Sequence, residues 1–271
     1  MRDLGETPGA GKRGTDMLSS LYLPPGPDGQ CHLYEPETMA WARIEFDGDY
    51  FRGTDIAIGA DGSVWVVGND PRPGGFGIYR WNGRVMEDRG GAGTGIAVGP
   101  DGLPWTVDDA GNIARLTPEG WRAVPGQARD IGIGADGSVW IIGCDRREGG
   151  YGIYRREGGD WVDAGGAALR ISVSPEGEPW VVTEQNFIFR RLGERWFQVQ
   201  GGAVDIAVGA DGNVWIAGSD HGWHGGYTVY HWNGRNFESI GSAGGRVAVA
   251  PNGMLWLINF RNGVYRRVVR V

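Results

Sequence analysis

The sequence has one lysine, two cysteines and no run of about 18 apolar residues, and each shortage excludes a class of protein. The net charge is −7 and the arginines form no basic stripe, so nucleic acid is not expected as a partner. Cys31 and Cys144 are too few for a disulfide framework. No membrane span and no apolar core of a signal peptide can be found. We expect a cytoplasmic protein, or one exported without a cleaved signal peptide.

Catalytic signatures are also missing. The sequence contains no HExxH pair, no nucleophile elbow, no phosphate-binding loop and no cysteine pair suited to a metal. One histidine group, His221 and His224 beside Asp220, occurs in a single loop and has no counterpart elsewhere. We therefore expect no enzyme, no catalytic residue and no cofactor.

Glycine and tryptophan are abundant, with 51 and 13 residues. Glycine is well above its usual share of about 7%, yet it follows no three-residue period, and 11% of the chain is aromatic. A disordered low-complexity chain would not contain so many large aromatic side chains. The composition favours a packed, turn-rich all-β body.

A short segment recurs along the chain. Asp205–Gly218 reads DIAVGADGNVWIAG, close copies begin at Asp55 and Asp130, and looser copies begin at Gly95, Arg170 and Arg246. One tryptophan marks each copy: Trp65, Trp105, Trp140, Trp180, Trp215 and Trp256. These tryptophans lie 40, 35, 40, 35 and 41 residues apart, which indicates a repeat architecture.

Each copy is predicted to form four short strands. An apolar strand leads to Asp-Gly, which favours a two-residue type I′ hairpin, and a second strand carries the tryptophan. A third strand such as Ile78–Arg80 follows, and a weaker fourth carries Trp121, Trp161 or Trp196. Four antiparallel strands per 35 to 40 residues are typical of a propeller blade, with the repeated tryptophans packed between blades.

The last copy lacks its fourth strand, and the segment Met39–Phe46 precedes the first copy as an unpaired strand. Pairing the two would close the ring and remove an open edge. We predict a six-bladed β-propeller over residues 39–271, with long and short blades alternating in pseudo-threefold symmetry. Residues 1–38 are predicted to be a flexible extension, either a solvated tail or an arm that docks a protein partner.

The three long blades have an expanded loop between their second and third strands. Each loop holds one aspartate and is followed by an aromatic residue; these are Asp70 with Phe76, Asp145 with Tyr151, and Asp220 with Tyr227, and the third loop also carries Trp223. A two-residue turn at Asp-Gly would place Asp205 opposite Gly218 and thus near Asp220. By the same count Asp55 lies near Asp70 and Asp130 near Asp145, whereas the short blades have Gly95, Arg170 and Arg246 at that position.

Three rim sites of two acids and an aromatic suit sugar recognition. Carboxylates accept hydrogen bonds from hydroxyls, aromatic rings stack on the apolar face of a sugar, and linked sites gain avidity. Two alternatives stay open: the acids could cap turn N–H groups, or each pair could hold Ca²⁺. Threefold repetition argues against acid–base catalysis by the pairs, because an enzyme usually needs one asymmetric site.

The combination I-x-V-G-x-D-G-x-V-W, I-Y-R and W-x-x-V-x-G, repeated six times over roughly residues 40–271, resembles the tectonin β-propeller repeat family. The resemblance implies a six-bladed propeller and a lectin for glycans on microbial or other cell surfaces, with O-methylated sugars and lipopolysaccharide among the ligands. We therefore expect a multivalent glycan-binding protein. The alternatives are a protein-interaction scaffold and, from the likeness of Gly95–Gly120 to one blade of streptogramin lyases, a propeller lyase.

Overall fold

A computed structural model describes residues 21–22, 33–34, 39–46, 49–222 and 226–269. The chain divides into two units, residues 1–35 and 36–271. In the first unit, β1 (Leu21–Tyr22) pairs antiparallel with β2 (Leu33–Tyr34). Apart from these two strands, the predicted flexible extension and its docking role fall outside the described residues.

The second unit is built from antiparallel sheets. Three of them contain four strands in sequence order: β6 (Gly53–Ile58), β7 (Val64–Arg72), β8 (Gly75–Trp81) and β9 (Met86–Gly93); β10 (Gly95–Val98), β11 (Pro104–Val107), β12 (Asn112–Thr117) and β13 (Gly120–Gln127); β14 (Asp130–Ile133), β15 (Val139–Arg147), β16 (Gly150–Glu157) and β17 (Asp160–Ala168). The described residues form strands and turns, and none of them forms a helix that could cross a membrane.

Two further groups of four strands are joined by one long strand. The seven-stranded sheet contains β18 (Arg170–Val173), β19 (Pro179–Val182), β20 (Phe187–Leu192), β21 (Arg195–Val208), β22 (Val214–His221), β23 (Tyr227–Trp232) and β24 (Phe237–Gly244). The 14 residues of β21 pair first with β20 and then, beyond a bulge, with β22. One strand therefore ends one group and begins the next.

The last sheet joins the two ends of the second unit. It contains β25 (Arg246–Val249), β26 (Leu255–Ile258), β27 (Val264–Val269) and β3 (Met39–Arg43), while β4 (Glu45–Phe46) and β5 (Asp49–Tyr50) form a small hairpin. Trp41 pairs with Arg267 in this sheet as Trp196 pairs with Arg191 in another. The segment expected to be an unpaired strand therefore completes the C-terminal sheet, with Trp41 in the position of Trp196.

The Asp-Gly hairpins differ from the predicted type I′ turns. Gly209 N–H donates to the Asn213 carbonyl at 2.9 Å, so the loop spans five residues, and Val208 pairs with Val214. Gly212 has a φ of 79°, while Asn186 and Asn262 are the only described non-glycine residues with positive φ. The Asp211 carboxylate accepts the Asn213 N–H at 3.0 Å, which stabilises this loop without positive φ at the aspartate. The register therefore shifts by one residue, and Asp205 lies opposite Ala217 rather than Gly218.

The repeated tryptophans pack between sheets, as predicted. Trp65 is fully buried in a cluster with Ile96 and Val98 of the following sheet, and its indole N–H donates to the Gly102 carbonyl at 3.1 Å. Trp140 makes the same bond to Gly177, also at 3.1 Å. Burying these large side chains against the neighbouring sheet is a main source of stability in such repeats.

The fifth repeat replaces an arginine with a histidine. Arg80 and Arg155 stack over Trp65 and Trp140, whereas His231 lies 4.4 Å from the Trp215 ring and is 2% exposed. Its Nε2 lies 3.1 Å from Asn213 Oδ1. Burial lowers the pKa of His231 to about 4, so the folded protein keeps it neutral.

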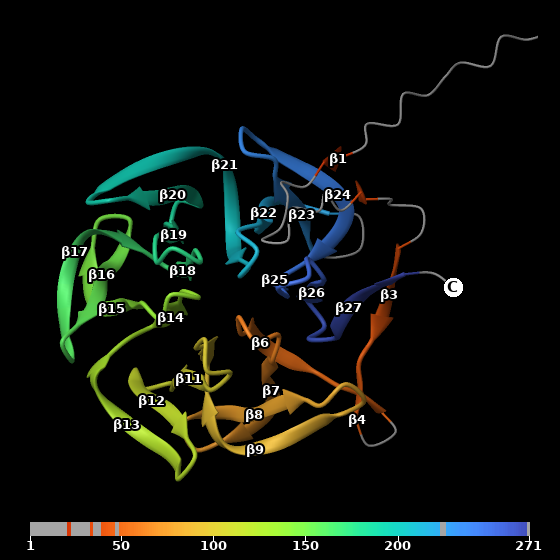
Figure 1. Cartoon of the computed structure of the whole chain (residues 1–271), viewed down its shortest axis with the longest axis horizontal. Coiled ribbons are helices and arrows are strands. Elements are labelled where there is room, and N and C mark those ends of the chain that lie inside the picture. Colours follow the sequence, from red (N-terminus) through yellow and green to blue (C-terminus); the bar gives the residue numbers. More distant parts are fainter. Residues whose placement is uncertain (1–20, 23–32, 35–38, 47–48, 223–225, 270–271) are drawn as a thin grey trace, which may run out of the picture. The chain divides into compact units, whose positions relative to one another are not determined.

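The first strands of all the four-stranded groups lie side by side. β10 contacts both β6 and β14, β18 contacts both β14 and β21, and β25 contacts both β21 and β6. Within residues 36–271, Figure 1 shows these first strands toward the middle and last strands such as β9, β13 and β17 toward the outside. Residues at the start of each first strand therefore meet residues that are far away in the sequence.

Candidate functional site

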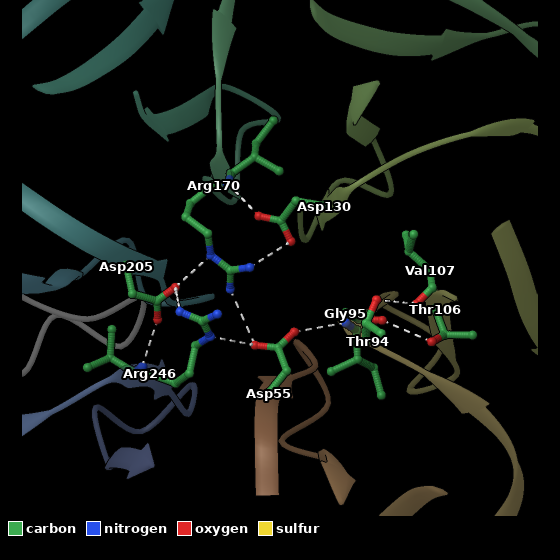
Figure 2. Close-up of polar contacts among 12 residues, drawn as sticks. Asp55, Thr94, Gly95, Thr106, Val107, Asp130, Arg170, Asp205 and Arg246 are labelled. Carbon is green, nitrogen blue, oxygen red and sulfur yellow. Dashed lines mark hydrogen bonds and ion pairs between the residues drawn. The ribbon is translucent and has the colours of Figure 1, made fainter. Parts of the chain in front are cut away.

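Five charged residues from the first strands converge at one end of the space that these strands enclose. We call them the axial cluster: Asp55, Asp130, Arg170, Asp205 and Arg246. Each occupies the same position in its copy of the repeat, at the beginning of the motif. Three of them are acids that the sequence placed in three separate rim sites, and the structure gathers them around Arg170 (Figure 2).

Each aspartate connects two neighbouring sheets. The Oδ2 atom of Asp55 accepts the Ile96 N–H at 3.0 Å, that of Asp130 accepts the Ile171 N–H at 2.9 Å, and that of Asp205 accepts the Val247 N–H at 2.9 Å. Each accepted N–H belongs to the first strand of the following sheet. The acids therefore satisfy buried backbone donors where two first strands meet.

The other oxygen of each carboxylate faces an arginine. The Arg170 guanidinium donates from Nε to Asp205 Oδ1 at 2.9 Å and from Nη2 to Asp55 Oδ1 at 3.3 Å, and its Nη1 lies 3.3 Å from Asp130 Oδ1. Arg246 forms longer ion pairs, 3.5 Å to Asp55 and 3.7 Å to Asp205. One planar guanidinium thus uses its separate donors to reach all three acids, which a lysine ammonium could not match in geometry.

The axial cluster has one acid more than it has arginines. Arg170 and Arg246 occupy two of the three short-repeat positions, and the third is Gly95, which has no side chain (Figure 2). A Cβ atom built on Gly95 would lie 3.7 Å from the Asp130 carboxylate and 3.8 Å from that of Asp55. Asp130 therefore lacks an arginine on the side that faces Gly95.

Burial raises the pKa values of two of these acids, Asp130 and Asp55. Desolvation raises the pKa of Asp130 to about 6, because Arg170 offsets only part of the cost of a buried charge. Burial also raises the pKa of Asp55, with Arg170 and Arg246 opposing the shift. Arg170 keeps its proton, since the surrounding carboxylates raise its pKa.

The axial cluster is suited to holding the sheets together rather than to binding a sugar. All three carboxylates bond both to backbone and to arginine, and the cavity beside them has a volume of about 80 Å³. Ligand pockets usually span about 300 to 1,000 Å³, whereas one water occupies about 30 Å³. The cavity is therefore large enough for a few waters but not for a saccharide.

The rim acids lie in other networks. Asp70 and Asp88 both bond to Arg72, at 2.8 Å each, and the Arg72 guanidinium also donates to the Tyr79 hydroxyl. Asp145, Asp163, Arg147 and Tyr154 repeat this arrangement. In the third copy the Asp220 carboxylate instead accepts hydrogen bonds from Thr228 and Tyr230.

The predicted pairing of inner and rim acids is therefore wrong. Asp55 bonds within the axial cluster while Asp70 bonds to Arg72, and Asp130 and Asp145 are separated in the same way, as are Asp205 and Asp220. The inner acids face the other first strands, and the five-residue turn places Asp55, Asp130 and Asp205 opposite Val67, Ile142 and Ala217, each one residue from the predicted partner. Among the described residues no group of three or more metal-ligand side chains is arranged to hold a metal ion.

The rim aromatics are part-buried and pack against other side chains. Arg129 stacks on Tyr151 at 4.0 Å, and Tyr227 lies between His221 at 5.4 Å and Phe260 at 5.0 Å. Phe76 packs against the cluster that contains Trp65. Trp223 lies outside the described residues.

An outer groove, which the sequence did not predict, has the size and lining of a ligand site. Its volume is about 470 Å³ and it is lined mainly by Phe187, Phe189, Trp196, Glu148, Thr183 and Gln185. Phe187 is 47% exposed, and the Trp196 indole N–H donates to the Ala164 carbonyl at 3.3 Å. The groove therefore combines aromatic faces with polar groups.

One signal in the sequence could have revealed the groove. Phe187 lies at a position where the first short repeat has Asn112 and the last has Gly263, whereas the position of Phe189 also carries an aromatic, Tyr265, in the last repeat. An aromatic side chain that occurs in one repeat, where the other repeats have small or polar residues, is not required for the packing that all repeats share. Attention to differences among the copies, rather than to what they share, points to Phe187.

Comparisons with known proteins agree with this fold. A family model described as "Tectonin domain" matches residues 92–191 and 146–224, which confirms the resemblance stated above. No curated protein matches the chain.

Several solved structures are similar in fold. A protein of unknown function from Bacteroides thetaiotaomicron has a TM-score of 0.60 at 10% identity, over 89% of this chain and 78% of its own. A streptogramin B lyase has a TM-score of 0.58 at 12% identity, over 88% and 100%. The protein YCF48 bound to a D1 peptide has a TM-score of 0.53 at 17% identity, over 85% and 82%. These likenesses show an all-β, propeller-like fold with four-stranded antiparallel blades.

Proposed function

We propose that this chain, whose residues 92–191 and 146–224 belong to the tectonin family, is a glycan-binding protein that performs no catalysis. The observation that carries the proposal is the outer groove, in which Phe187, Phe189 and Trp196 lie beside Glu148, Thr183 and Gln185. Aromatic side chains cover the C–H face of a sugar, and the polar groups exchange hydrogen bonds with its hydroxyls. A sugar that carries O-methyl groups would bury more apolar surface there than an unmodified one.

The proposal includes a six-bladed ring. The pairing of β27 with β3 and the contact of β25 with β6 support it, since together they leave no open edge between the last group of strands and the first. The three long groups, with their longer β7, β15 and β22, alternate with short ones and give the pseudo-threefold arrangement. A rigid ring of this kind can present a glycan site to a repetitive cell surface.

The likeness to streptogramin B lyase concerns the fold and does not extend the proposal to an enzyme. The acids of the axial cluster are all bonded, and the rim acids Asp70 and Asp145 are ion-paired to Arg72 and Arg147. A carboxylate whose oxygens already bond to backbone or arginine is poorly placed as a general base, because a general base must reach the substrate proton within hydrogen-bond distance.

The Phe187→Ala variant tests the groove. We expect at least a tenfold loss of affinity for the glycan that the wild type selects on a glycan array, because the exposed ring that stacks on the sugar is removed. Phe197→Ala is the matched control, since Phe197 is 45% exposed on the adjacent strand β21 and does not line the groove. Equal affinity in both variants and the wild type would exclude the groove as the binding site.

The rim acids can be tested in the same assay. Binding at the rim predicts that an Asp70→Asn, Asp145→Asn and Asp220→Asn triple variant loses the glycan while Phe187→Ala keeps it. Binding in the groove predicts the reverse result. YCF48 was solved with a peptide, so a third outcome, capture of a peptide and no array signal, would favour the scaffold alternative.

A further inference from the structure

A third cavity, larger than the outer groove and the cavity beside the axial cluster, lies where the C-terminal sheet meets the small hairpin β4–β5. Its volume is about 970 Å³. We call it the basic cleft, and the residues that matter for its chemistry are Arg43, Tyr50, Arg52, Phe260, Arg261 and Tyr265. They come from β3, β5, the link between β5 and β6 (Arg52), the turn between β26 and β27, and β27 itself.

The arginines of the basic cleft have no acidic partner among the described residues. Arg43 stacks on the Tyr50 ring at 3.6 Å and lies 5.7 Å from the Tyr265 ring, while its buried Nε has no hydrogen-bond partner in the described part of the chain. Arg52 and Arg261 are exposed and form no ion pair within that part of the chain. The nearby Asp49 carboxylate accepts the Tyr50 N–H at 2.7 Å instead of pairing with an arginine.

Three arginines that line one cleft and form no ion pair among the described residues repel one another, although the protein has a net charge of −7. Some other arginines of this chain are paired: Arg72 and Arg147 each bond to two aspartates, and Arg115 bonds to Asp101 at 2.6 Å. Binding of an anion would remove the repulsion and supply the missing hydrogen-bond acceptors. The charge pattern therefore fits an anionic ligand.

Comparison of the repeats supports a specific role. The turn between the second and third strands of a short repeat carries Asp108 and Asp109 in the first copy, and Thr183 and Glu184 in the second. Glu184 pairs with Arg146 at 2.6 Å. In the third copy the same positions are Asn259 and Phe260, followed by Arg261. The charge at this turn is thus reversed in one repeat only, at the place where Arg43 and Arg52 also lie.

We propose that the basic cleft binds a ligand with an oxyanion group, a carboxylate, sulfate or phosphate, carried on a sugar ring. Guanidinium groups bind such oxygens with strong, directional hydrogen bonds. The exposed rings of Tyr50 and Phe260, 49% and 48% accessible, provide faces on which the sugar can stack. The assignment does not depend on the outer groove and stands even if that groove binds nothing.

Calorimetric titration at low ionic strength tests the proposal with four probes: inorganic sulfate, inorganic phosphate, a glucuronate-containing disaccharide and its neutral glucose counterpart. We expect saturable binding of the three anions, tightest for the acidic disaccharide, and no binding of the neutral one. The double variant Arg52→Gln with Arg261→Gln should bind the acidic disaccharide at least tenfold more weakly, because each charged hydrogen bond contributes roughly a factor of ten to the affinity. Both side chains are exposed, so the fold should survive the changes.

Arg84→Gln with Arg235→Gln is the control, since it removes the same charge from two exposed turns. This pair should keep the wild-type affinity within about twofold, given that distant surface charges are screened by salt. Equal losses in both double variants would overturn the proposal, because they would show that net charge alone attracts the anion. Failure of the wild type to bind the anionic probes at millimolar concentration, or equal binding of the neutral disaccharide, would overturn it too.

Discussion

Replacing Arg170 by methionine should lower the free energy of unfolding by about 3 to 5 kcal/mol at pH 7, the usual cost of removing one partner from a buried ion pair. Arg170 is the residue that reaches all three acids of the axial cluster, at 2.9 to 3.3 Å. Without it, Asp55 and Asp205 keep only the longer ion pairs with Arg246, and Asp130 loses the ion pair that it forms with Arg170. Urea denaturation followed by tryptophan fluorescence measures the loss.

Arg190→Met provides the control for this prediction. Arg190 belongs to the same sheet and stacks over Trp180 at 5.6 Å, but it forms no ion pair in the described part of the chain. Arg190→Met should lower the free energy of unfolding by well under half as much as Arg170→Met does. The deficit of Arg170→Met should shrink as the pH falls below 6, because protonated carboxyls no longer need the arginine. A loss below about 1 kcal/mol at pH 7 would show that the axial cluster contributes little to stability.

The Asp130→Asn variant should become progressively more stable than the wild type as the pH rises. Burial raises the pKa of Asp130 from 3.8 to about 6, so the folded state holds a proton that the unfolded state has released. The stability that this group contributes is present below pH 4 and is lost as the pH rises through 6. Asparagine never carries the charge, and its side-chain oxygen can still accept the Ile171 N–H.

The expected change in the variant-minus-wild-type difference is about 2 kcal/mol between pH 4.5 and pH 7.5, measured by urea denaturation at both values. The variant is compared with the wild type at each pH, because His231 makes the opposite contribution to the pH dependence of stability. Its pKa is lowered to about 4, so the stability that it contributes is lost as the pH falls from the unfolded value toward 4. His231 is present in both proteins, and its contribution cancels. A difference that does not change with pH would contradict the raised pKa of Asp130.

Much of the architecture could be predicted from the sequence, because the local signals for strands agreed with the spacing of the tryptophans. The tryptophan spacing indicated the repeats, and the missing last strand indicated the role of Met39–Arg43, which the structure places beside β27. The turns were harder to predict from the sequence. Asp-Gly is compatible with both a two-residue and a five-residue loop, and the Asp211 side chain, which bonds to Asn213, favours the longer one.

The functional residues were harder to predict, because their positions depend on contacts between repeats. A one-residue change of register decides whether Asp205 faces the rim or the other first strands. A comparison of charges could have helped, since Asp55, Asp130 and Asp205 alternate with Gly95, Arg170 and Arg246 at one position of the motif. Opposite charges at equivalent positions of a closed repeat are expected to meet at its centre.

The outer groove and the basic cleft differ from the axial cluster, because each contains residues that occur in one copy of the repeat only. Both contain residues that deviate from the repeat, Phe187 in one copy and Phe260 and Arg261 in another. Residues shared by all copies, such as the tryptophans, are needed for packing in each of them. Residues specific to one copy are free to serve a ligand.

The most direct test of the proposed function is a nuclear magnetic resonance titration of the labelled protein with the glycan selected on an array. We predict that backbone shifts concentrate at Glu148–Gly149, Thr183–Phe189 and Trp196, the residues of the outer groove. Shifts confined to the axial cluster or to the loops around Asp70, Asp145 and Asp220, with the groove unaffected, would contradict the account.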